Sequence, residues 1–308
     1  IFRVIDIDAS GSGEASSMLT MTYANGSGAF SATMSLPSDA YITANATDGA
    51  NNMSEFSPNF AGPRSLLVDT KLDVTHATPC DRSTPADCSL RDALTVAVSG
   101  DTVLFDSSIF SNSAGVIQLT SALPPLSQGV VSIQGNGAGT TIIDGASAGA
   151  NVSGFVVTSS SNTISRLTIR GFAGTGVWVK AANNSLYSLQ IDGSGGDGIV
   201  IHDVANNRVG QCGNPDAGNS VVRSGGYGVV IRGEGADNNV IGDNSIGGSS
   251  SDGNAAGGVL VENGPDNTRV GCSPGNVRWF YVSGNGGNGI TVLGPSTTGV
   301  SSQGLEVG

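Results

Sequence analysis

Branched apolar residues recur along the chain in short runs, each interrupted by glycine, asparagine or serine. Such runs between turn-forming residues are typical of short β-strands. The chain sustains no helical periodicity of apolar positions, and no apolar run reaches the roughly 18–20 residues that a membrane-spanning helix needs. The pattern predicts an all-β protein made of many short strands.

One pattern of small and apolar residues repeats. A Gly-x-Gly step followed by an alternating apolar pair begins at Gly174, Gly196, Gly226 and Gly287, with a relaxed copy at Ala256. The second glycines of these copies are spaced by 22, 30, 30 and 31 residues. A unit of 22 residues with three strands and three turns is one coil of a parallel β-helix, whose successive coils pair backbone to backbone. A flat β-sandwich with coincidental glycines is the alternative, which the aligned copies disfavour.

The repeat also predicts the interior and the corners of the coils. Asparagines after each copy would form a hydrogen-bonded ladder at one corner, and glycines would supply corners with positive φ. The longer spacings place insertion loops near 211–219, 247–254 and 272–276. The alternating pairs would form one inward column: Val177/Val179, Ile199/Ile201, Val229/Ile231, Val259/Val261 and Ile290/Val292.

Residues 1–62 have a different pattern. Alternating runs at 17–23, 29–36 and 41–46, with turns at Asn25-Gly26 and Asp48-Gly49, favour antiparallel strands. Three or four strands are few for an independent sandwich. We therefore expect a partial antiparallel β-sandwich module at 1–62 and a parallel β-helix at 63–308. Ser89 is a candidate N-cap for a short helix near 88–98 that would cover the open first coil.

Several motifs resemble those of one known family. YITANATDGANNMSEFS at 41–57 resembles the TATATD…GNTSEFS ending of a β-sandwich module in bacterial extracellular right-handed parallel β-helix repeat proteins. CSLRDAL at 88–94, with GDTVLFD at 100–106 and SALPPL at 121–126, resembles the CSLREA-type motif with which those helices begin. IQGNGAGTTIIDG at 133–145 and QGLEVG at 303–308 are similar to a later coil and to the helix exit.

The resemblance implies a right-handed helix, an extracellular or cell-surface location, and units that repeat in tandem. In the family the helix commonly runs into the sandwich, whereas here a partial sandwich comes first and a helix-exit motif comes last. The offset implies either a longer tandem-repeat polypeptide or a neighbouring unit that completes the fold. The expected partner is therefore another unit of the same kind.

Cysteines and charge bear on location and partners. Cys80 and Cys88 flank a short proline-bearing loop, which favours a disulfide in an exported chain. Cys212 and Cys272 occupy equivalent turns two coils apart, about 9–10 Å by coil spacing alone. They form a disulfide if their insertion loops bend together and are otherwise two free thiols. The net charge of −12 and the lack of a basic patch argue against nucleic acid as a partner.

Candidate catalytic residues are few. Asp192, Asp197, Asp203 and His202 gather near one face, and paired carboxylates carry out catalysis in polysaccharide-active enzymes of this architecture. Aspartates in glycine-rich corners are, however, typical of turns, so no catalytic residue is predicted. His76 and His202 lack ligand spacing and no CxxC is present, so no transition metal is expected.

Calcium is the one cofactor for which the sequence offers ligands. Asp6, Asp8 and Glu14 lie in a segment of alternating oxygen-bearing side chains, and Asp48 lies in an asparagine-rich turn. Both groups suit a hard cation. The family resemblance explains the Asp48 turn as structural, so the expectation is no cofactor, with Ca²⁺ as the alternative.

The outward positions between the inward pairs form an apolar stripe. We call Trp178, Val200, Val230 and Leu260 the outer stripe. An exposed apolar stripe usually marks a contact surface. It could pack against another subunit, lie under the chain's own loops, or offer aromatic rings to sugars, and the sequence leaves these alternatives open.

The sequence thus favours an exported, non-catalytic structural or adhesive protein. Its β-helix rods would assemble end to end into a cell-surface filament, with strand complementation between units. The alternatives are a polysaccharide lyase or glycoside hydrolase, and a carbohydrate-binding module that contacts surface glycans through the outer stripe.

Overall fold

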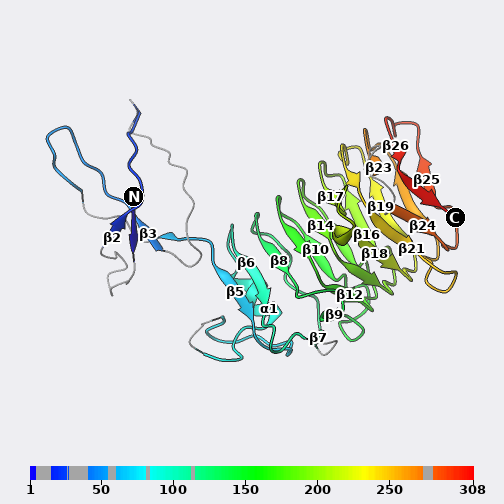
Figure 1. Ribbon diagram of the computed structural model, residues 1–308, viewed down its shortest axis with the longest axis horizontal. Helices are drawn as coiled ribbons and strands as arrows, with labels where there is room; N and C mark the ends of the chain where they lie inside the picture. The colour runs from blue at the N-terminus through cyan, green and yellow to red at the C-terminus, as the bar shows by residue number, and fades with distance from the viewer. Residues whose placement is uncertain are drawn as a thin grey trace. The chain divides into compact units, whose positions relative to one another are not determined.

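The computed structural model describes residues 1–4, 15–25, 27, 41–54, 60–80, 84–111, 115–272 and 280–308. These residues divide into two compact units, one of Ile1–Ser65 with Gly100–Thr102 and the other of Leu66–Ser99 with Val103–Gly308. The first contains a four-stranded antiparallel sheet, and the second is a parallel β-helix (Figure 1). Both the all-β class and the parallel β-helix were predicted from the sequence.

The antiparallel sheet has the strand order β2-β1-β3-β4. Its strands are β1 (Phe2–Val4), β2 (Ala15–Met18), β3 (Tyr41–Thr43) and β4 (Phe60–Ala61). The run predicted at 41–46 contains the shorter β3, whereas the run predicted at 17–23 overlaps β2 only at residues 17 and 18. The strand predicted at 29–36 lies outside the described residues.

The described residues of the β-helix form three sheets, and successive coils are stacked along one axis (Figure 1). The six-strand sheet consists of β10 (Phe155–Val157), β13 (Val177–Val179), β16 (Ile199–His202), β19 (Tyr227–Arg232), β22 (Gly257–Glu262) and β25 (Ile290–Leu293). The nine-strand sheet consists of β5 (Ser65–Val68), β6 (Thr102–Phe105), β8 (Ser132–Gln134), β11 (Thr163–Ser165), β14 (Ser185–Tyr187), β17 (Arg208–Val209), β20 (Val240–Ile241), β23 (Arg269–Gly271) and β26 (Ser301–Gln303). The eight-strand sheet consists of β7 (Gly115–Gln118), β9 (Thr141–Asp144), β12 (Thr168–Arg170), β15 (Gln190–Asp192), β18 (Asn219–Val222), β21 (Asn244–Gly247), β24 (Phe280–Ser283) and β27 (Leu305–Val307).

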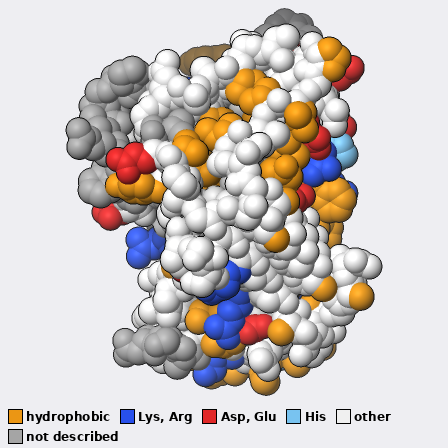
Figure 2. Space-filling view, turned by 90° about the vertical axis from the view of Figure 1, so that its right-hand side faces the viewer, with side chains coloured by type: hydrophobic (Ala, Val, Ile, Leu, Met, Phe, Trp, Pro, Cys, Tyr) orange, Lys and Arg blue, Asp and Glu red, His pale blue; other side chains and the backbone are white. Residues whose placement is uncertain are grey.

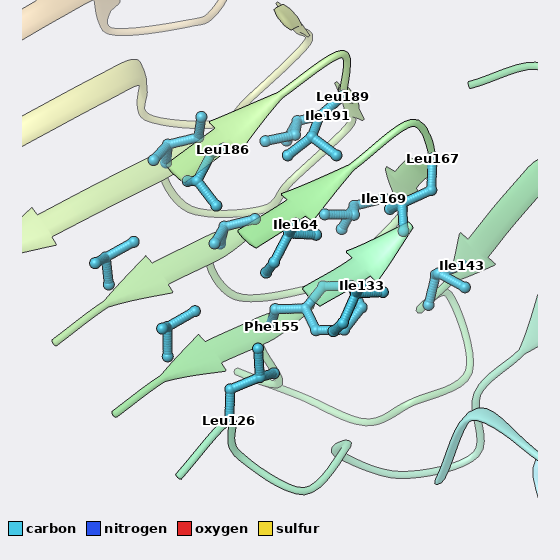
Figure 3. Packing of buried hydrophobic residues seen from close by; sticks show 14 of the residues in the cluster. Leu126, Ile133, Ile143, Phe155, Ile164, Leu167, Ile169, Leu186, Leu189 and Ile191 are labelled. Carbon is cyan, nitrogen blue, oxygen red and sulfur yellow. The ribbon is translucent and has the colours of Figure 1, made fainter. Parts of the chain in front are cut away.

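Inward side chains of successive coils stack in register and form the core. Val177 is in register with Ile199 and, on the following coils, with Val229 and Val259. All four side chains are fully buried, as the alternating pattern predicted. The other two sheets contribute similar columns, which Figure 3 shows side by side: Ile133, Ile164 and Leu186 from the nine-strand sheet, and Ile143, Ile169 and Ile191 from the eight-strand sheet.

The repeated glycines are required by close contact between coils. The prediction that they supply corners with positive φ is wrong for this repeat. A Cβ at Gly198 would lie 2.4 Å from Cγ1 of Val221 and 2.5 Å from the carbonyl oxygen of Gly228 on the next coil. Asparagines instead adopt the left-handed conformation at one corner, with φ of 62° at Asn183 and 61° at Asn206. Asparagine reaches this region more readily than most residues.

The predicted asparagine ladder is present at this corner. The backbone N–H of Asn162 donates to Oδ1 of Asn184 (2.7 Å), that of Asn184 to Asn207 (2.8 Å), and that of Asn207 to Asn239 (2.8 Å). All four side chains are buried. Two further ladders that the sequence analysis did not predict join Asn219 to Asn244 and Asn254 to Asn285.

A short helix, α1 (Leu90–Val96), lies at the N-terminal end of the β-helix, within the range predicted for a cap. The side chains of Leu90, Ala93, Leu94 and Ala97 are buried in the same cluster as the core. Ser89 is the N-cap and forms a capping box with Asp92, so two helix N-terminal N–H groups are satisfied. The helix therefore covers apolar core at this end of the solenoid.

Candidate functional site

The outer stripe is continuous in register, and three of its four residues are buried. Trp178, Val200, Val230 and Leu260 are paired on successive strands of the six-strand sheet. Val200 is 5%, Val230 0% and Leu260 6% exposed, and Trp178 and Tyr227 pack against them. The expectation of an exposed contact surface is therefore wrong for these three residues.

An ion pair accounts for part of this cover. Asp197 precedes β16 and Arg232 ends β19, and Nη2 of Arg232 lies 3.2 Å from Oδ2 of Asp197. Because one partner precedes Val200 and the other follows Val230, the pair bridges the middle of the stripe. Oδ1 of Asp197 also accepts the backbone N–H of Tyr227 at 2.8 Å.

Trp178, at one end of the outer stripe, is covered by a cation. Nζ of Lys180 lies 3.6 Å from the centroid of the Trp178 ring. A cation over an indole face is a favourable arrangement. The ring face on that side is therefore occupied, which argues against the expectation that Trp178 offers its face to sugars.

The candidate catalytic aspartates are engaged in separate polar contacts. Oδ2 of Asp192 lies 2.5 Å from Nη2 of Arg223. Nη1 of the same arginine lies 2.8 Å from Oδ1 of Asp252. The hydrogen bond and charge of Asp192 raise the pKa of the Arg223 guanidinium, so it stays a cation. Asp203 instead lies 3.3 Å from Nε2 of His202. The structure thus places Asp192 and Asp203 in different polar contacts.

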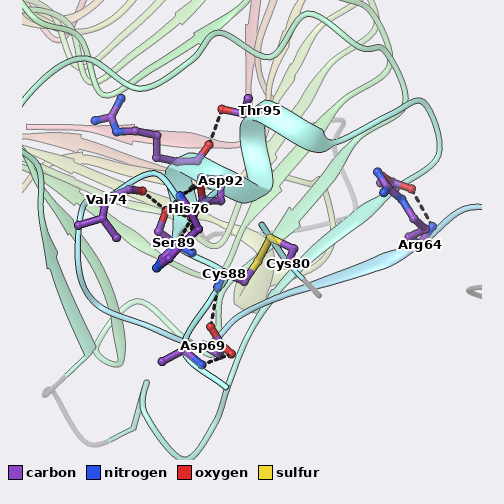
Figure 4. The surroundings of a disulfide bond; sticks show 12 residues. Arg64, Asp69, Val74, His76, Cys80, Cys88, Ser89, Asp92 and Thr95 are labelled. Carbon is purple, nitrogen blue, oxygen red and sulfur yellow. Dashed lines mark hydrogen bonds and ion pairs between the residues drawn. A yellow bond between two sulfur atoms is a disulfide. The ribbon is translucent and has the colours of Figure 1, made fainter. Parts of the chain in front are cut away.

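The first disulfide lies beside the cap helix. Cys80 and Cys88 are bonded, with their Cα atoms 4.3 Å apart (Figure 4). Oδ1 of Asp69 accepts the backbone N–H of Cys88 at 2.9 Å, which ties the loop to the end of β5. The pair closes the proline-bearing loop directly before the N-cap of α1.

The second disulfide joins loops two coils apart. Cys212 and Cys272 are bonded, with their Cα atoms 5.5 Å apart. Gly242 occupies the equivalent corner of the intervening coil, and a Cβ there would lie 3.1 Å from the backbone nitrogen of Cys212. The loop of Cys212 therefore bends across a corner that has no side chain, which resolves the alternatives left open by coil spacing.

His76, Asp92 and Ser89 form a cluster that resembles a catalytic triad in composition only. Nδ1 of His76 lies 2.6 Å from Oδ2 of Asp92, and the same oxygen lies 2.8 Å from Oγ of Ser89 (Figure 4). The carboxylate thus lies between the imidazole and the hydroxyl. A nucleophilic serine needs the imidazole as its direct neighbour. The cluster fits the capping of α1.

The calcium candidates are only partly described. Asp6, Asp8 and Glu14 lie outside the described residues. Asp48 is exposed, and Oδ1 accepts the backbone N–H groups of Ala50 and Asn52, which closes a turn. Hydrogen bonds from Asn52, chiefly from its side chain, and from Ala50 lower the pKa of the Asp48 carboxyl. Within the described part of the chain, no group of three or more His, Cys, Asp and Glu side chains is arranged to hold a metal ion.

A groove that the sequence analysis missed lies on the outer face of the nine-strand sheet. A hollow of about 630 Å³ is bounded by β14, β17 and β20 on one side and by the 211–217 segment, which contains the short 3₁₀ helix η1 (Pro215–Ala217), on the other. Arg166, Tyr187 and Arg208 contribute side chains to it. A second hollow of about 500 Å³ shares Arg166 and Asp216 with the first. The predicted insertion near 211–219 was the available signal, but the sequence did not show which face it borders.

Together these features define a disulfide-bonded parallel β-helix with a groove beside its 211–219 insertion loop. Two disulfides fit a secreted or extracellular protein. None of the helices in the described residues is long and apolar enough to cross a membrane. Comparison with protein-family models, with curated proteins and with solved structures found no match.

Proposed function

We propose that the protein is an exported, non-catalytic structural or adhesive rod whose units join end to end. The observation that supports this most is where the exposed apolar side chains lie. Among the described residues, the large apolar side chains that are more than a third exposed fall within residues 18–130 and 281–307. The described residues of the coils between these ranges contribute none of them.

The last coil carries one group of exposed apolar side chains. Val292 is 46%, Leu293 50% and Val307 57% exposed. They belong to β25 and β27, and these strands and β26 are each the last in their sheet, so one edge of each has no partner among the described strands. Figure 2 faces this end and shows hydrophobic side chains on it. Unpaired edges flanked by apolar side chains favour the addition of further strands.

The N-terminal unit carries another group. Met18 is 60%, Met21 67%, Tyr23 87% and Met53 71% exposed. A single sheet of four short strands has no second layer among the described strands to bury these side chains. Its edge strands β2 and β4 also lack an outer partner there. We infer that the N-terminal unit of one chain covers the open coil of another.

The cap helix gives this assembly a direction. α1 covers the end of the β-helix core opposite to β25–β27 (Figure 1). Because that end is covered, two β-helices would not stack directly through it. Joining the open coil to the N-terminal unit of the next chain is therefore the favoured arrangement, and it would extend into a filament.

The test is the size distribution of the 1–308 chain over a wide concentration range, by sedimentation velocity and electron microscopy. We expect elongated oligomers that grow with concentration. The double variant Val292→Asp, Leu293→Asp should abolish them, because it places charge on the open coil. Val130→Asp alters an equally exposed valine (54%) that lies outside both the N-terminal unit and the last coil, and it should leave assembly unchanged. A monodisperse monomer at all concentrations would refute the proposal, as would equal loss of assembly in the control.

A further inference from the structure

The groove beside the 211–219 insertion has an unusual charge for this protein. The chain has a net charge of −12, yet Arg166 and Arg208 line the groove and both are exposed. Within the described residues neither forms an ion pair, whereas Arg91, Arg170 and Arg223 each contact an aspartate at 2.8 Å or less. Two unpaired guanidinium groups on one concave face are suited to bind a carboxylate through paired N–H donors.

A third arginine extends the same face. Arg208, Val240 and Arg269 are in register on β17, β20 and β23. The two arginines are therefore about 10 Å apart, two strand spacings along the helix axis. Nη2 of Arg269 lies 3.7 Å from Sγ of Cys212, while its Nε is buried without a hydrogen-bond partner. Cationic groups thus recur along the axis at a spacing that an elongated anion could follow.

The remaining lining residues suit a sugar better than a bare anion. Tyr187 offers an aromatic ring, and Gln211 and Asn214 offer amide groups. Asp216, the one carboxylate in the lining, would accept hydrogen bonds from sugar hydroxyls.

We propose that this groove binds an acidic oligosaccharide, with uronate carboxylates held by Arg166 and Arg208 and a sugar ring lying against Tyr187. Two contacts hold the insertion that borders the groove. The Cys212–Cys272 disulfide holds one end of the insertion, and Oγ of Ser188 donates to the carbonyl oxygen of Asp216 at 2.7 Å and holds the other. A preformed site loses less conformational entropy on binding.

The test is calorimetric titration of the 1–308 chain with hexasaccharides of galacturonate, mannuronate and hyaluronan, with cellohexaose as the neutral control and sodium sulfate as the simple anion. We expect binding of at least one uronate hexasaccharide, weakened by added salt. Cellohexaose and sulfate should not bind measurably.

Variants locate the site. Arg166→Gln and Arg208→Gln should each weaken uronate binding about ten-fold or more, as expected for loss of a charge-assisted hydrogen bond. Lys180→Gln removes the same charge from the six-strand sheet and should leave binding unchanged. Thermal unfolding of each variant checks that the fold is retained.

Three results would overturn the proposal. They are no binding of any uronate hexasaccharide, binding of cellohexaose or sulfate as strong as that of the uronates, or a loss of uronate binding in Lys180→Gln equal to that in the arginine variants. The inference does not depend on the rod proposal. The Val292→Asp, Leu293→Asp variant should bind the hexasaccharide normally even as a monomer, so the two proposals fail separately.

Discussion

The backbone N–H of Asn184 donates a 2.8 Å hydrogen bond to Oδ1 of Asn207 on the next coil, and Oδ1 of Asn184 accepts the N–H of Asn162 from the coil before. Each buried asparagine therefore accepts one corner N–H through its side-chain oxygen and donates its own backbone N–H to the asparagine of the next coil. The Nδ2 group of Asn184 also donates to the carbonyl oxygens of Ala181 and Ala182. An unpaired buried polar group would be costly at this position.

We expect Asn184→Ala to lower the free energy of unfolding by about 1–3 kcal/mol, because it leaves the buried N–H of Asn162 without an acceptor. Urea unfolding followed by circular dichroism measures the change. Asn183→Gly is the matched control, since Asn183 is exposed and already has φ of 62°. Equal stability of Asn184→Ala and the native protein would show that the ladder does not stabilise the coils.

Close packing of the repeated glycines makes a second prediction. Gly198→Ala should destabilise the protein by about 1–3 kcal/mol, as overpacked sites do, because Val221 and the backbone of Gly228 already occupy the space. Thermal unfolding gives the comparison. Gly139→Ala adds the same methyl group where nothing lies within 4 Å and should change little. If both variants melt alike, glycine at this repeat position is not required by packing.

The capping cluster predicts acid sensitivity. Burial raises the pKa of Asp92, but hydrogen bonds from His76 and Ser89 outweigh it, so the pKa lies below its ordinary value of 3.8. A lowered carboxyl pKa contributes stability that is present above the unfolded pKa and is lost as pH falls through the folded pKa. Stability should therefore decline below about pH 4, near the unfolded aspartate pKa.

Asp92→Asn tests this origin of the acid sensitivity. The variant should be less stable at pH 7 and should lose part of the acid-dependent decline, as measured by thermal melts from pH 7 to pH 2. Asp216→Asn removes an exposed carboxylate of η1 and should leave the profile nearly native. An unchanged pH profile in Asp92→Asn would contradict the assignment.

The second disulfide depends on a glycine in the coil between its cysteines. Gly242→Val should hinder closure of the Cys212–Cys272 bond, because even its Cβ would lie 3.1 Å from the backbone nitrogen of Cys212. Thiol titration of the denatured, unreduced protein should then detect free thiols that the native protein lacks. Gly139→Val serves as the control, and absence of free thiols in Gly242→Val would disprove the requirement.

Much of the fold could be predicted because its determinants repeat locally. The alternation at Val177 and Val179 recurs on later coils, and pairing coil against coil turns a linear repeat into a buried column. The N-cap at Ser89 and the corner asparagines are likewise encoded within a few residues. Such signals need no knowledge of distant contacts.

The burial of the outer stripe and the existence of the groove could not be predicted from such local signals. Val230 is buried partly because Arg232 reaches Asp197, which lies 35 residues earlier in the chain. Arg166 and Arg208 line one hollow only because the 211–217 segment borders that face of the nine-strand sheet. Periodicity along the chain therefore determined the coils and their interior. The outward surface was decided by the tertiary structure, because long side chains and insertion loops from different coils meet there.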